Sequence, residues 1–411
     1  MIKLLRKITP KFVFNCYHKT LPFLGALIYR FPAKKIKVIG VTGTNGKTTT
    51  VEMISAILRG CGFKVATMSS IKFDIDGNVE PNMLKMTMPG RFIIQKTIRR
   101  AVDSGCQYIV LEVTSEGIKQ FRHRCIDFYA VVMTNLSPEH IESHGGFDNY
   151  KNAKGELFRL NNNIHILNID DEHFEFFSGF FAKKKYSYGI GSGDVNAVDV
   201  KTDASGSNFK IEGVEFKTSF PGEFNVYNSL AAISLGLSLG LDLNSISKSL
   251  SLMGNVEGRM EEIVNSPFRV IVDYAFTPNA LEKVYQTIKK DFKPNKMICV
   301  LGACGGGRDK WKRPVLGKIA DNNCDSVIIT NEDPYDEDPI EIINQVAKDV
   351  DNPIKIEDRR EAINKAISIA SSGDCVIITG KGCEPWICVA DGKKIAWDDR
   401  QVVREEINKI L

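Results

Sequence analysis

The chain has 411 residues, of which 43% are apolar and 25% are charged, and a formal net charge of +4. This length exceeds a single hydrophobic core, so two or three domains are expected. The net charge is too small to indicate nucleic-acid binding. Ten cysteines without a C-x-x-C pair argue against a disulfide scaffold or a zinc site, and they favour a reducing cytoplasm.

The first 36 residues form a basic, apolar N-terminal segment. Residues 1–35 hold eight lysines and arginines among leucine, phenylalanine, tyrosine and isoleucine. The apolar piece LPFLGALIYRF is too short to span a bilayer and contains Pro22. Two interpretations stay open. The segment is either a helix packed on the first domain or a basic amphipathic element that contacts the anionic inner face of the membrane.

Residues 36–50, IKVIGVTGTNGKTTT, predict a strand, a phosphate-sized loop and a helix. The run from Ile36 to Val41 is typical of a buried parallel strand, and helical spacing begins at Lys47. Backbone N–H groups of the loop would face the β- and γ-phosphates, with Lys47 as a point charge and Thr48 as a Mg²⁺ ligand. Val41 occupies the place of the first glycine of the common pattern, so the turn is Gly43-x-x-Gly46-Lys47-Thr48.

Two further apolar runs end on polar residues, YIVLE and FYAVVMTN. Because the carboxyl ends of parallel strands meet at the ligand crevice, Glu112 and His140 are expected near the phosphates. A helix from Asn149 carries Lys154, residues 195–220 alternate in short antiparallel-like runs, and a helix rich in small residues follows.

The second half alternates strand and helix from RVIVDYA to CVIITGKG, which predicts a parallel sheet with helical crossovers. Its turn GACGGGRDK does not meet the G-x-G-x-x-G pattern of dinucleotide-binding proteins. The predicted fold is α/β, with a central P-loop ATPase domain on a mostly parallel sheet and a C-terminal Rossmann-like domain. The expected limits are 1–36 for the N-terminal segment, 37–256 for the central domain and 257–411 for the C-terminal, amino-acid-binding domain.

The chain resembles the ATP-dependent Mur ligases of peptidoglycan synthesis, which share a plan with folylpolyglutamate synthetases. Within that family it looks most like the UDP-N-acetylmuramoyl-tripeptide synthetases, which add the third peptide residue. The resemblance rests on ten motifs in family order, which are GTNGKTTT (43–50), EVTSEG (112–117), TNLSPEHIESHG (134–145), NAKGELF (152–158), FNVYNSLAA (224–232), EGRME (257–261), VDYAFTP (272–278), GRDKWKRP (307–314), TNEDP (330–334) and GKGCE (380–384).

The resemblance implies that ATP phosphorylates an acceptor carboxylate and that an amino acid then attacks the acyl phosphate, giving an amide, ADP and phosphate. It implies ATP, two Mg²⁺ ions and a CO₂-derived carbamate on Lys154 as cofactors, and a muramoyl-peptide-like acceptor and an amino acid as partners. The implied catalytic residues are Lys47, Glu112, His140 and Lys154, and the implied metal ligands are Thr48, Glu112, His140 and Lys154.

The resemblance also implies binding residues. For ATP they are Gly43, Thr44, Asn45, Gly46, Lys47, Thr48, Thr49, Asn228, Arg259 and Asp273. For the acceptor they are Thr87, Thr114, Gln120 and Arg122. For the amino acid they are Arg308, as a planar fork for the α-carboxylate, and Asp333, Gly380 and Glu384, which would face a distal ammonium.

Several positions depart from the family pattern. Only ~36 residues precede the P-loop, where the family usually places a UDP-binding domain. Three alternatives stay open: uridine recognition is weak, a partner supplies it, or the acceptor is a different, lipid-linked glycopeptide. Members that add diaminopimelate carry DNPR, whereas residues 332–335 read EDPY, so Tyr335 replaces the arginine that reads the second carboxylate. Lysine or another diamino acid is therefore as plausible as diaminopimelate. Cys383, Phe276 and Glu116 replace family histidines.

Two other functions compete with the muramoyl-peptide ligase. One is polyglutamylation of folate or a similar acceptor on the same scaffold, against which the RDKWKRP and GKGCE motifs argue. The other is a nucleotide-binding scaffold or regulatory protein without ligase activity. The presence of Lys47, Glu112, His140 and Lys154 argues against that loss.

Overall fold

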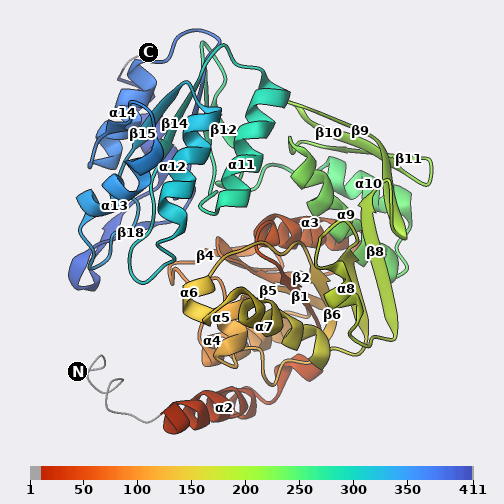
Figure 1. Ribbon diagram of the computed structural model, residues 1–411. Coiled ribbons are helices and arrows are strands. Elements are labelled where there is room, and N and C mark those ends of the chain that lie inside the picture. The colour runs from red at the N-terminus through yellow and green to blue at the C-terminus, as the bar shows by residue number, and fades with distance from the viewer. Residues whose placement is uncertain (1–10, 410–411) are drawn as a thin grey trace. The chain divides into compact units, whose positions relative to one another are not determined.

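The structure is a computed structural model that describes residues 11–409. Contacts between residues divide the chain into two compact units (Figure 1). Unit 1 comprises Met1–Leu136, Tyr150–Ala197 and Tyr227–Leu250, and unit 2 comprises Ser137–Asn149, Val198–Val226 and Ser251–Leu411. The domain limits expected from the sequence stay a prediction, and residues 1–10 of the N-terminal segment lie outside the described residues.

Unit 1 is built on parallel strands joined by helices. Its elements are α2 (Lys11–Ile28), the 3₁₀-helix η1 (Pro32–Lys34), β1 (Lys37–Thr42), α3 (Lys47–Gly60), β2 (Val65–Met68), β3 (Lys72–Ile75), β4 (Asn78–Pro81), α4 (Arg91–Asp103), β5 (Tyr108–Glu112), α5 (Ser115–Lys119), β6 (Phe128–Met133), most of α7 (Phe147–Leu160), β7 (Ile164–Asn168), α8 (Phe174–Ser178), β8 (Lys184–Ile190), the start of β9 (Val195–Asp203), most of α9 (Glu223–Ser238) and nearly all of α10 (Leu243–Ser251).

The strand order in unit 1 is β8-β7-β6-β1-β5-β2-β3-β4. Strands β8 to β2 in this order run parallel, and β3 and β4 pair antiparallel at the edge. The central strands consist of continuous apolar residues that are buried, as expected for a sheet covered by helices on both faces. The predicted phosphate-loop strand is β1, which lies between β5 and β6, so its carboxyl end opens at the middle of the sheet.

Unit 2 has three sheet regions. Its elements are α6 (Ile141–His144), the end of β9, β10 (Gly206–Ile211), β11 (Val214–Thr218), β12 (Glu261–Val264), β13 (Arg269–Val272), α11 (Pro278–Thr287), the π-helix η2 (Ile288–Phe292), β14 (Met297–Leu301), α12 (Lys312–Asn323), β15 (Ser326–Ile329), α13 (Pro339–Val346), the 3₁₀-helix η3 (Ala347–Asp349), β16 (Ile354–Lys355), α14 (Arg359–Ser368), β17 (Cys375–Ile378), β18 (Trp386–Cys388), the 3₁₀-helix η4 (Ala390–Gly392), β19 (Lys394–Ala396) and α15 (Asp399–Ile407).

Strands β9, β10 and β11 pair antiparallel, which confirms the antiparallel patch predicted for residues 195–220. A six-stranded sheet has the order β12-β13-β17-β14-β15-β16, and all its pairs are parallel except β12 with β13. Strands β18 and β19 form a separate antiparallel pair. The predicted Rossmann-like alternation is therefore confirmed. The fold class, an α/β chain with a large, mostly parallel sheet and a second sheet, is confirmed as well.

Helix α2 packs against α4 through small residues. A Cβ atom added at Gly25 would lie 3.5 Å from Gln95 Cγ and 3.6 Å from the carbonyl oxygen of Arg91, so the two helices approach closely there. The Arg91 guanidinium also donates a hydrogen bond to the ring of His18. Among residues 11–409, no helix has both the length and the apolar character that crossing a bilayer requires.

Close packing in unit 2 predicts a position-specific effect of adding one methyl group. A Cβ atom at Gly317 in α12 would lie 1.9 Å from the carbonyl oxygen of Val346, the last residue of α13, and a backbone atom cannot move away cheaply. We expect Gly317→Ala to lower the free energy of unfolding by about 1–3 kcal/mol in urea titrations. The control is Gly254→Ala, because a Cβ there meets no atom within 4 Å. Equal stability of the two variants would contradict this packing.

Candidate functional site

The phosphate loop connects β1 to α3 and needs glycine at two positions. Gly46 has a φ of +81°, and a Cβ atom there would lie 2.2 Å from Asn228 Oδ1. A Cβ atom at Gly43 would lie 1.9 Å from Thr134 Oγ1. Any side chain at these two sites would collide with the residues around the loop, so both positions require glycine. Asn228, predicted from the resemblance to lie near adenine, packs directly on the loop.

Polar residues after β6 hold the loop in place. The amide of Thr44 donates to the Asn135 carbonyl at 2.8 Å, and the amide of Asn45 donates to Asn135 Oδ1 at 3.0 Å. The Thr134 hydroxyl donates to the carbonyl of Asn45 at 2.7 Å. The hydroxyls of Thr44 and Tyr150 are 2.9 Å apart, and the side chain of Thr49 is buried. The loop is therefore fixed before any ligand arrives.

Two lysines converge on one carbonyl oxygen of the loop. Lys47 Nζ donates to the carbonyl of Gly43 at 3.1 Å and to that of Thr44 at 2.8 Å. Lys154 Nζ donates to the same Gly43 oxygen at 2.8 Å, and it lies 4.8 Å from the ring centroid of Tyr150. The side chain of Lys154 is buried, and burial together with the charge of Lys47 lowers its pKa well below the ordinary value.

An oxygen-rich cluster lies at the start of α3. The Thr48 hydroxyl donates to Glu112 Oε1 at 2.8 Å, and the amide of Ser70 donates to the same oxygen at 2.9 Å. The hydroxyls of Thr48 and Ser70 are 2.9 Å apart. Carboxylate and hydroxyl oxygens are the ligands that Mg²⁺ prefers, so these residues fit that ion. Sequence analysis identified Thr48 and Glu112 but not Ser70.

The four residues predicted for the acceptor lie in unit 1 near α5. The Thr114 hydroxyl caps α5 by accepting a hydrogen bond from the amide of Gly117 at 3.1 Å. Arg122 donates to Gln120 Oε1 at 2.8 Å and to the carbonyl of Met88, the residue after Thr87. The structure therefore brings Gln120, Arg122 and the segment of Thr87 together. It assigns them no ligand.

His140 belongs to unit 2, where residues 139–142 are bound to the turn before α12. Glu139 and Lys312 form an ion pair of 2.8 Å between side chains that are 3% and 4% exposed. The carboxylate of Asp309 accepts the amides of Ile141 at 3.0 Å and Glu142 at 3.1 Å. His140 itself has a φ of +57° at the start of α6. These contacts within unit 2 join the segment of His140, the predicted metal ligand, to the segment of Arg308, the predicted clamp.

Arg259 and Asp273, predicted for ATP, lie close together in unit 2. The guanidinium carbon of Arg259 lies 4.5 Å from the ring centroid of Tyr274. Asp273 accepts the amides of Met260 and Ala275, each at 2.7 Å. Burial raises the pKa of Asp273, although the charge of Arg259 opposes that shift.

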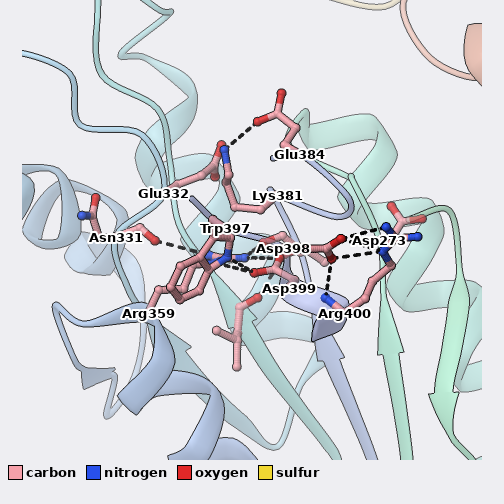
Figure 2. Close-up of polar contacts among 12 residues, drawn as sticks. Asp273, Asn331, Glu332, Arg359, Lys381, Glu384, Trp397, Asp398, Asp399 and Arg400 are labelled. Carbon is pink, nitrogen blue, oxygen red and sulfur yellow. Dashed lines mark hydrogen bonds and ion pairs between the residues drawn. The ribbon is translucent and has the colours of Figure 1, made fainter. Parts of the chain in front are cut away.

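The residues predicted for a distal ammonium surround a lysine that sequence analysis missed. Lys381 is fully buried, and its Nζ donates to both oxygens of Asp333 at 3.1 Å and to Glu384 Oε2 at 2.6 Å. The hydroxyl of Tyr274 donates to Glu384 Oε1 at 2.7 Å. Figure 2 shows Lys381 between Glu384 and Glu332. The side chain of Arg308 is exposed. Its backbone amide donates a hydrogen bond to the carbonyl of Gly305 and so closes a turn.

Glu332 adds a third carboxyl group to this acidic cluster, which we define as Glu332, Asp333 and Glu384. Glu332 is 2% exposed, and Cys304 Sγ donates to its Oε1 at 2.9 Å. Its Oε2 has no hydrogen-bond partner among the residues that the structure describes. A Cβ atom at Gly380 would lie 2.5 Å from that oxygen, so only glycine fits beside it. Burial and the charge of Asp333 raise the pKa of Glu332.

A buried ion pair supports the acidic cluster from below (Figure 2). Arg359 donates to both oxygens of Asp399, at 2.8 and 2.7 Å, and to the carbonyl of Thr379 at 2.8 Å. Trp397 Nε1 donates to the same carboxylate at 2.8 Å. The pair joins the first residues of α14 and α15 and fixes the strand end that leads to Gly380 and Lys381.

The Glu139–Lys312 pair predicts a large loss of stability when only one charge is removed. We expect Lys312→Met to lower the free energy of unfolding by about 3–5 kcal/mol, because it leaves Glu139 buried and unpaired. Glu139→Leu combined with Lys312→Met should recover most of the loss. The matched control is Lys310→Met, since Lys310 is 55% exposed and pairs with Glu337 at the surface. Urea unfolding of the four proteins tests this, and equal losses at Lys312 and Lys310 would refute it.

Comparison with known proteins gives matches over most of the chain. A family described as the Mur ligase middle domain matches residues 41–236, and one described as Mur ligase, glutamate ligase domain matches residues 258–382. The UDP-N-acetylmuramoyl-L-alanyl-D-glutamate–2,6-diaminopimelate ligase of Syntrophomonas wolfei is 38% identical over 400 residues, which cover 94% of this chain and 81% of the relative. The ligase of the same name from Aquifex aeolicus is 36% identical over 393 residues, with coverages of 93% and 80%.

Solved structures agree with these matches. A structure of a UDP-N-acetylmuramoyl-L-alanyl-D-glutamate–2,6-diaminopimelate ligase is 30% identical to this chain and has a TM-score of 0.62. The match covers 91% of this chain and 79% of the chain in that structure. A folylpolyglutamate synthase from Mycobacterium tuberculosis complexed with ADP and AMPPCP has a TM-score of 0.74 at 17% identity, with coverages of 88% and 92%, and shares the fold. The chain therefore belongs to the Mur ligase family and is a ligase.

Proposed function

We propose that this ligase joins the carboxylate of a muramoyl-peptide-like acceptor to a diamino acid in an ATP-dependent reaction through an acyl phosphate. The γ-phosphoryl group passes to a carboxylate oxygen of the acceptor, and ADP leaves. The amine of the amino acid then attacks the acyl carbon, the C–O bond to phosphate breaks, and the proton lost by the amine goes to solvent. The products are an amide, ADP and phosphate. The names of the relatives support this choice of acceptor.

The observation that carries the proposal is the convergence of Lys47 and Lys154 on the carbonyl of Gly43. Two ammonium groups on one neutral oxygen repel each other, so the arrangement favours an anion beside Lys47 and a neutral or anionic Lys154. A triphosphate on the loop supplies the anion, with backbone N–H groups and Lys47 around it. Preformed charges of this kind stabilise phosphoryl transfer without reorganisation.

Thr48 and Glu112 would hold Mg²⁺, and His140 is proposed for a second ion. Mg²⁺ neutralises charge on the phosphates and orients them when it is bound. Ser70 keeps the Glu112 carboxylate in position through its amide. Because Glu112 is only 2% exposed, its orientation is fixed by these hydrogen bonds and not by water.

We also propose that Lys154 carries a carbamate. Its lowered pKa favours the neutral amine, which is the form that attacks the carbon of CO₂. An N–C bond forms as one C–O π bond of CO₂ opens, the nitrogen loses a proton to solvent, and the neutral amine becomes an anion with two oxygen atoms that can bind a metal ion. This change removes the repulsion from Lys47 and adds a carboxylate-like group beside the Gly43 carbonyl.

The acidic cluster supports a diamino acid as the second substrate. Lys381 donates to Asp333 and Glu384 together, and burial with the charge of Asp333 raises the pKa of the neighbouring Glu332. Such a concentration of carboxyl groups attracts a distal ammonium. Arg308 is proposed to clamp the α-carboxylate as a planar fork. Tyr335 offers no cation for a second carboxylate, so lysine and ornithine are substrates to test beside diaminopimelate.

Substitutions of Lys154 test the carbamate. We expect Lys154→Ala to abolish ligation and added bicarbonate or acetate to restore part of it, because a small carboxylate fills the space left by the side chain. Lys154→Arg keeps a cation there and should not be rescued. For the wild type, activity should rise with pH through the lowered pKa of Lys154, since only the neutral amine takes up CO₂. ADP release measures each case, and full activity of Lys154→Ala without added carboxylate would refute the carbamate.

The second substrate is tested by amino-acid-dependent ADP release. We expect diaminopimelate, lysine or ornithine to stimulate release with a UDP-linked muramoyl dipeptide, and alanine, leucine and glutamate to give at least ~10-fold less, the ratio that ~1.4 kcal/mol of discrimination produces. Asp333→Asn should reduce the ratio of ADP release with diamino acids to release with the other amino acids, because it weakens the electrostatic attraction of the distal ammonium. Equal stimulation by leucine and lysine would exclude the diamino acid.

A folate-type acceptor is the competing ligase function, and a scaffold without turnover is the competing non-enzymatic one. In the same assay, ADP release with a folate and glutamate but not with a muramoyl peptide would favour the first. ATP binding without release for any acceptor pair would favour the second. The shared fold with folylpolyglutamate synthase does not discriminate, because 17% identity indicates the fold alone.

A further inference from the structure

Helix α2 has an unusual distribution of side chains. Its described residues bury small groups against α4 and expose large apolar ones. Gly25 and Ala26 are buried, whereas Phe23, Leu24, Leu27 and Ile28 are exposed by 52%, 45%, 53% and 64%. A surface helix of a globular protein ordinarily shows the reverse pattern.

The four exposed residues lie on one face of the helix. At 100° per residue, positions 23, 24, 27 and 28 fall within an arc of about 140°. The packed face is settled independently, since Gly25 touches Arg91 and Gln95 of α4. The exposed face of α2, defined as Phe23, Leu24, Leu27 and Ile28, is therefore a continuous apolar stripe that turns away from the sheet of unit 1. Figure 1 shows α2 beside α4 and at the margin of unit 1.

Positive charge continues from this stripe. Arg30, Lys34, Lys35 and Lys37 are exposed directly after the helix. Residues 1–35 carry eight basic residues, and the chain has no aspartate or glutamate before Glu52. A segment with many basic residues and no acidic ones is attracted along its whole length by an anionic lipid surface, whereas binding to a protein does not require this charge distribution. Within residues 11–409 no helix is long and apolar enough to cross a bilayer, so contact would be interfacial.

We propose that the exposed face of α2 binds the surface of an anionic membrane, with Phe23, Leu24, Leu27 and Ile28 inserted at the headgroup level and Arg30, Lys34 and Lys35 on the headgroups. Apolar insertion and electrostatic attraction are both needed, because either one alone gives weak, reversible binding. This proposal is independent of the ligase reaction, since none of these residues touches the phosphate loop or the acidic cluster.

The test is sedimentation of the full chain with vesicles of phosphatidylcholine, with and without phosphatidylserine. We expect binding to the anionic vesicles alone and a loss of binding at high salt. Leu27→Ser combined with Ile28→Ser should weaken the partition coefficient at least ~10-fold, because two exposed aliphatic side chains lose their burial in lipid. Leu160→Ser is the control, since Leu160 is 45% exposed at the end of α7 and outside the stripe.

Charge is tested with a matched pair of variants. Arg30→Glu combined with Lys34→Glu should weaken binding to anionic vesicles. The control is Lys183→Glu combined with Lys184→Glu, which changes the net charge by the same amount at exposed sites of β8 and its preceding turn. This control should keep most of the vesicle binding. Circular dichroism and ATP binding verify that every variant is folded. Equal binding of the Leu27/Ile28 variant and wild type would overturn the proposal. So would a dimer in light scattering that this variant breaks, without vesicle binding, because the stripe would then bind a second copy.

Discussion

The carbonyl oxygen of Gly43 is the point on which the site depends. Lys47 and Lys154 both donate to it, from the first turn of α3 and from the middle of α7. The loop can hold this geometry because Thr134 and Asn135 tie its backbone to the end of β6, and because glycine is the only residue that fits at positions 43 and 46. Repulsion between two ammonium groups is avoided when one is neutral. The buried lysine is the one whose pKa is lowered, which is why Lys47 is proposed to bind phosphate and Lys154 to carry the carbamate.

Unit 2 also buries charge, and it does so in pairs and clusters. Glu139 with Lys312, and Arg359 with Asp399, are almost fully withdrawn from water. Ion pairs of this kind add little stability relative to apolar residues, but they are costly to break, so each pair holds together the two segments that it joins. The acidic cluster differs because its carboxyl groups gather around one lysine. Lys381 donates to Asp333 and Glu384 together, at the place where an amino-acid substrate is proposed to enter.

The sequence predicted the strand, loop and helix at 36–60 to within one residue, since an apolar run, two glycines and a GKT turn leave few alternatives. It also predicted the parallel sheet of the second half, where buried runs alternate with helical periodicity. It did not identify Ser70 or Tyr150, because these lie far from the loop in sequence and carry no motif of their own. Asn135 lies within the motif TNLSPEHIESHG, but the motif does not reveal that this side chain holds the phosphate loop. Lys381 was passed over within GKGCE, since the sequence does not reveal that this lysine is buried between two carboxylates. Which roles His140 and Arg308 have stays a prediction.

For the N-terminal helix, the composition revealed a basic and apolar segment, but the spacing of its apolar residues did not reveal which face is buried. The apolar run LPFLGALIYRF suits a packed helix and a membrane-surface helix equally. Only the structure shows that the small residues are the ones buried on α4, which leaves the large ones exposed.

The transfer of oxygen from acceptor to phosphate tests the central claim most directly. With an acceptor whose carboxylate is labelled with ¹⁸O, formation of an acyl phosphate followed by amine attack must move one labelled oxygen from each carboxylate into the released phosphate. The account predicts that labelled phosphate appears in step with the amide. Release of ADP with unlabelled phosphate, while both labelled oxygens stay on the acceptor, would contradict it.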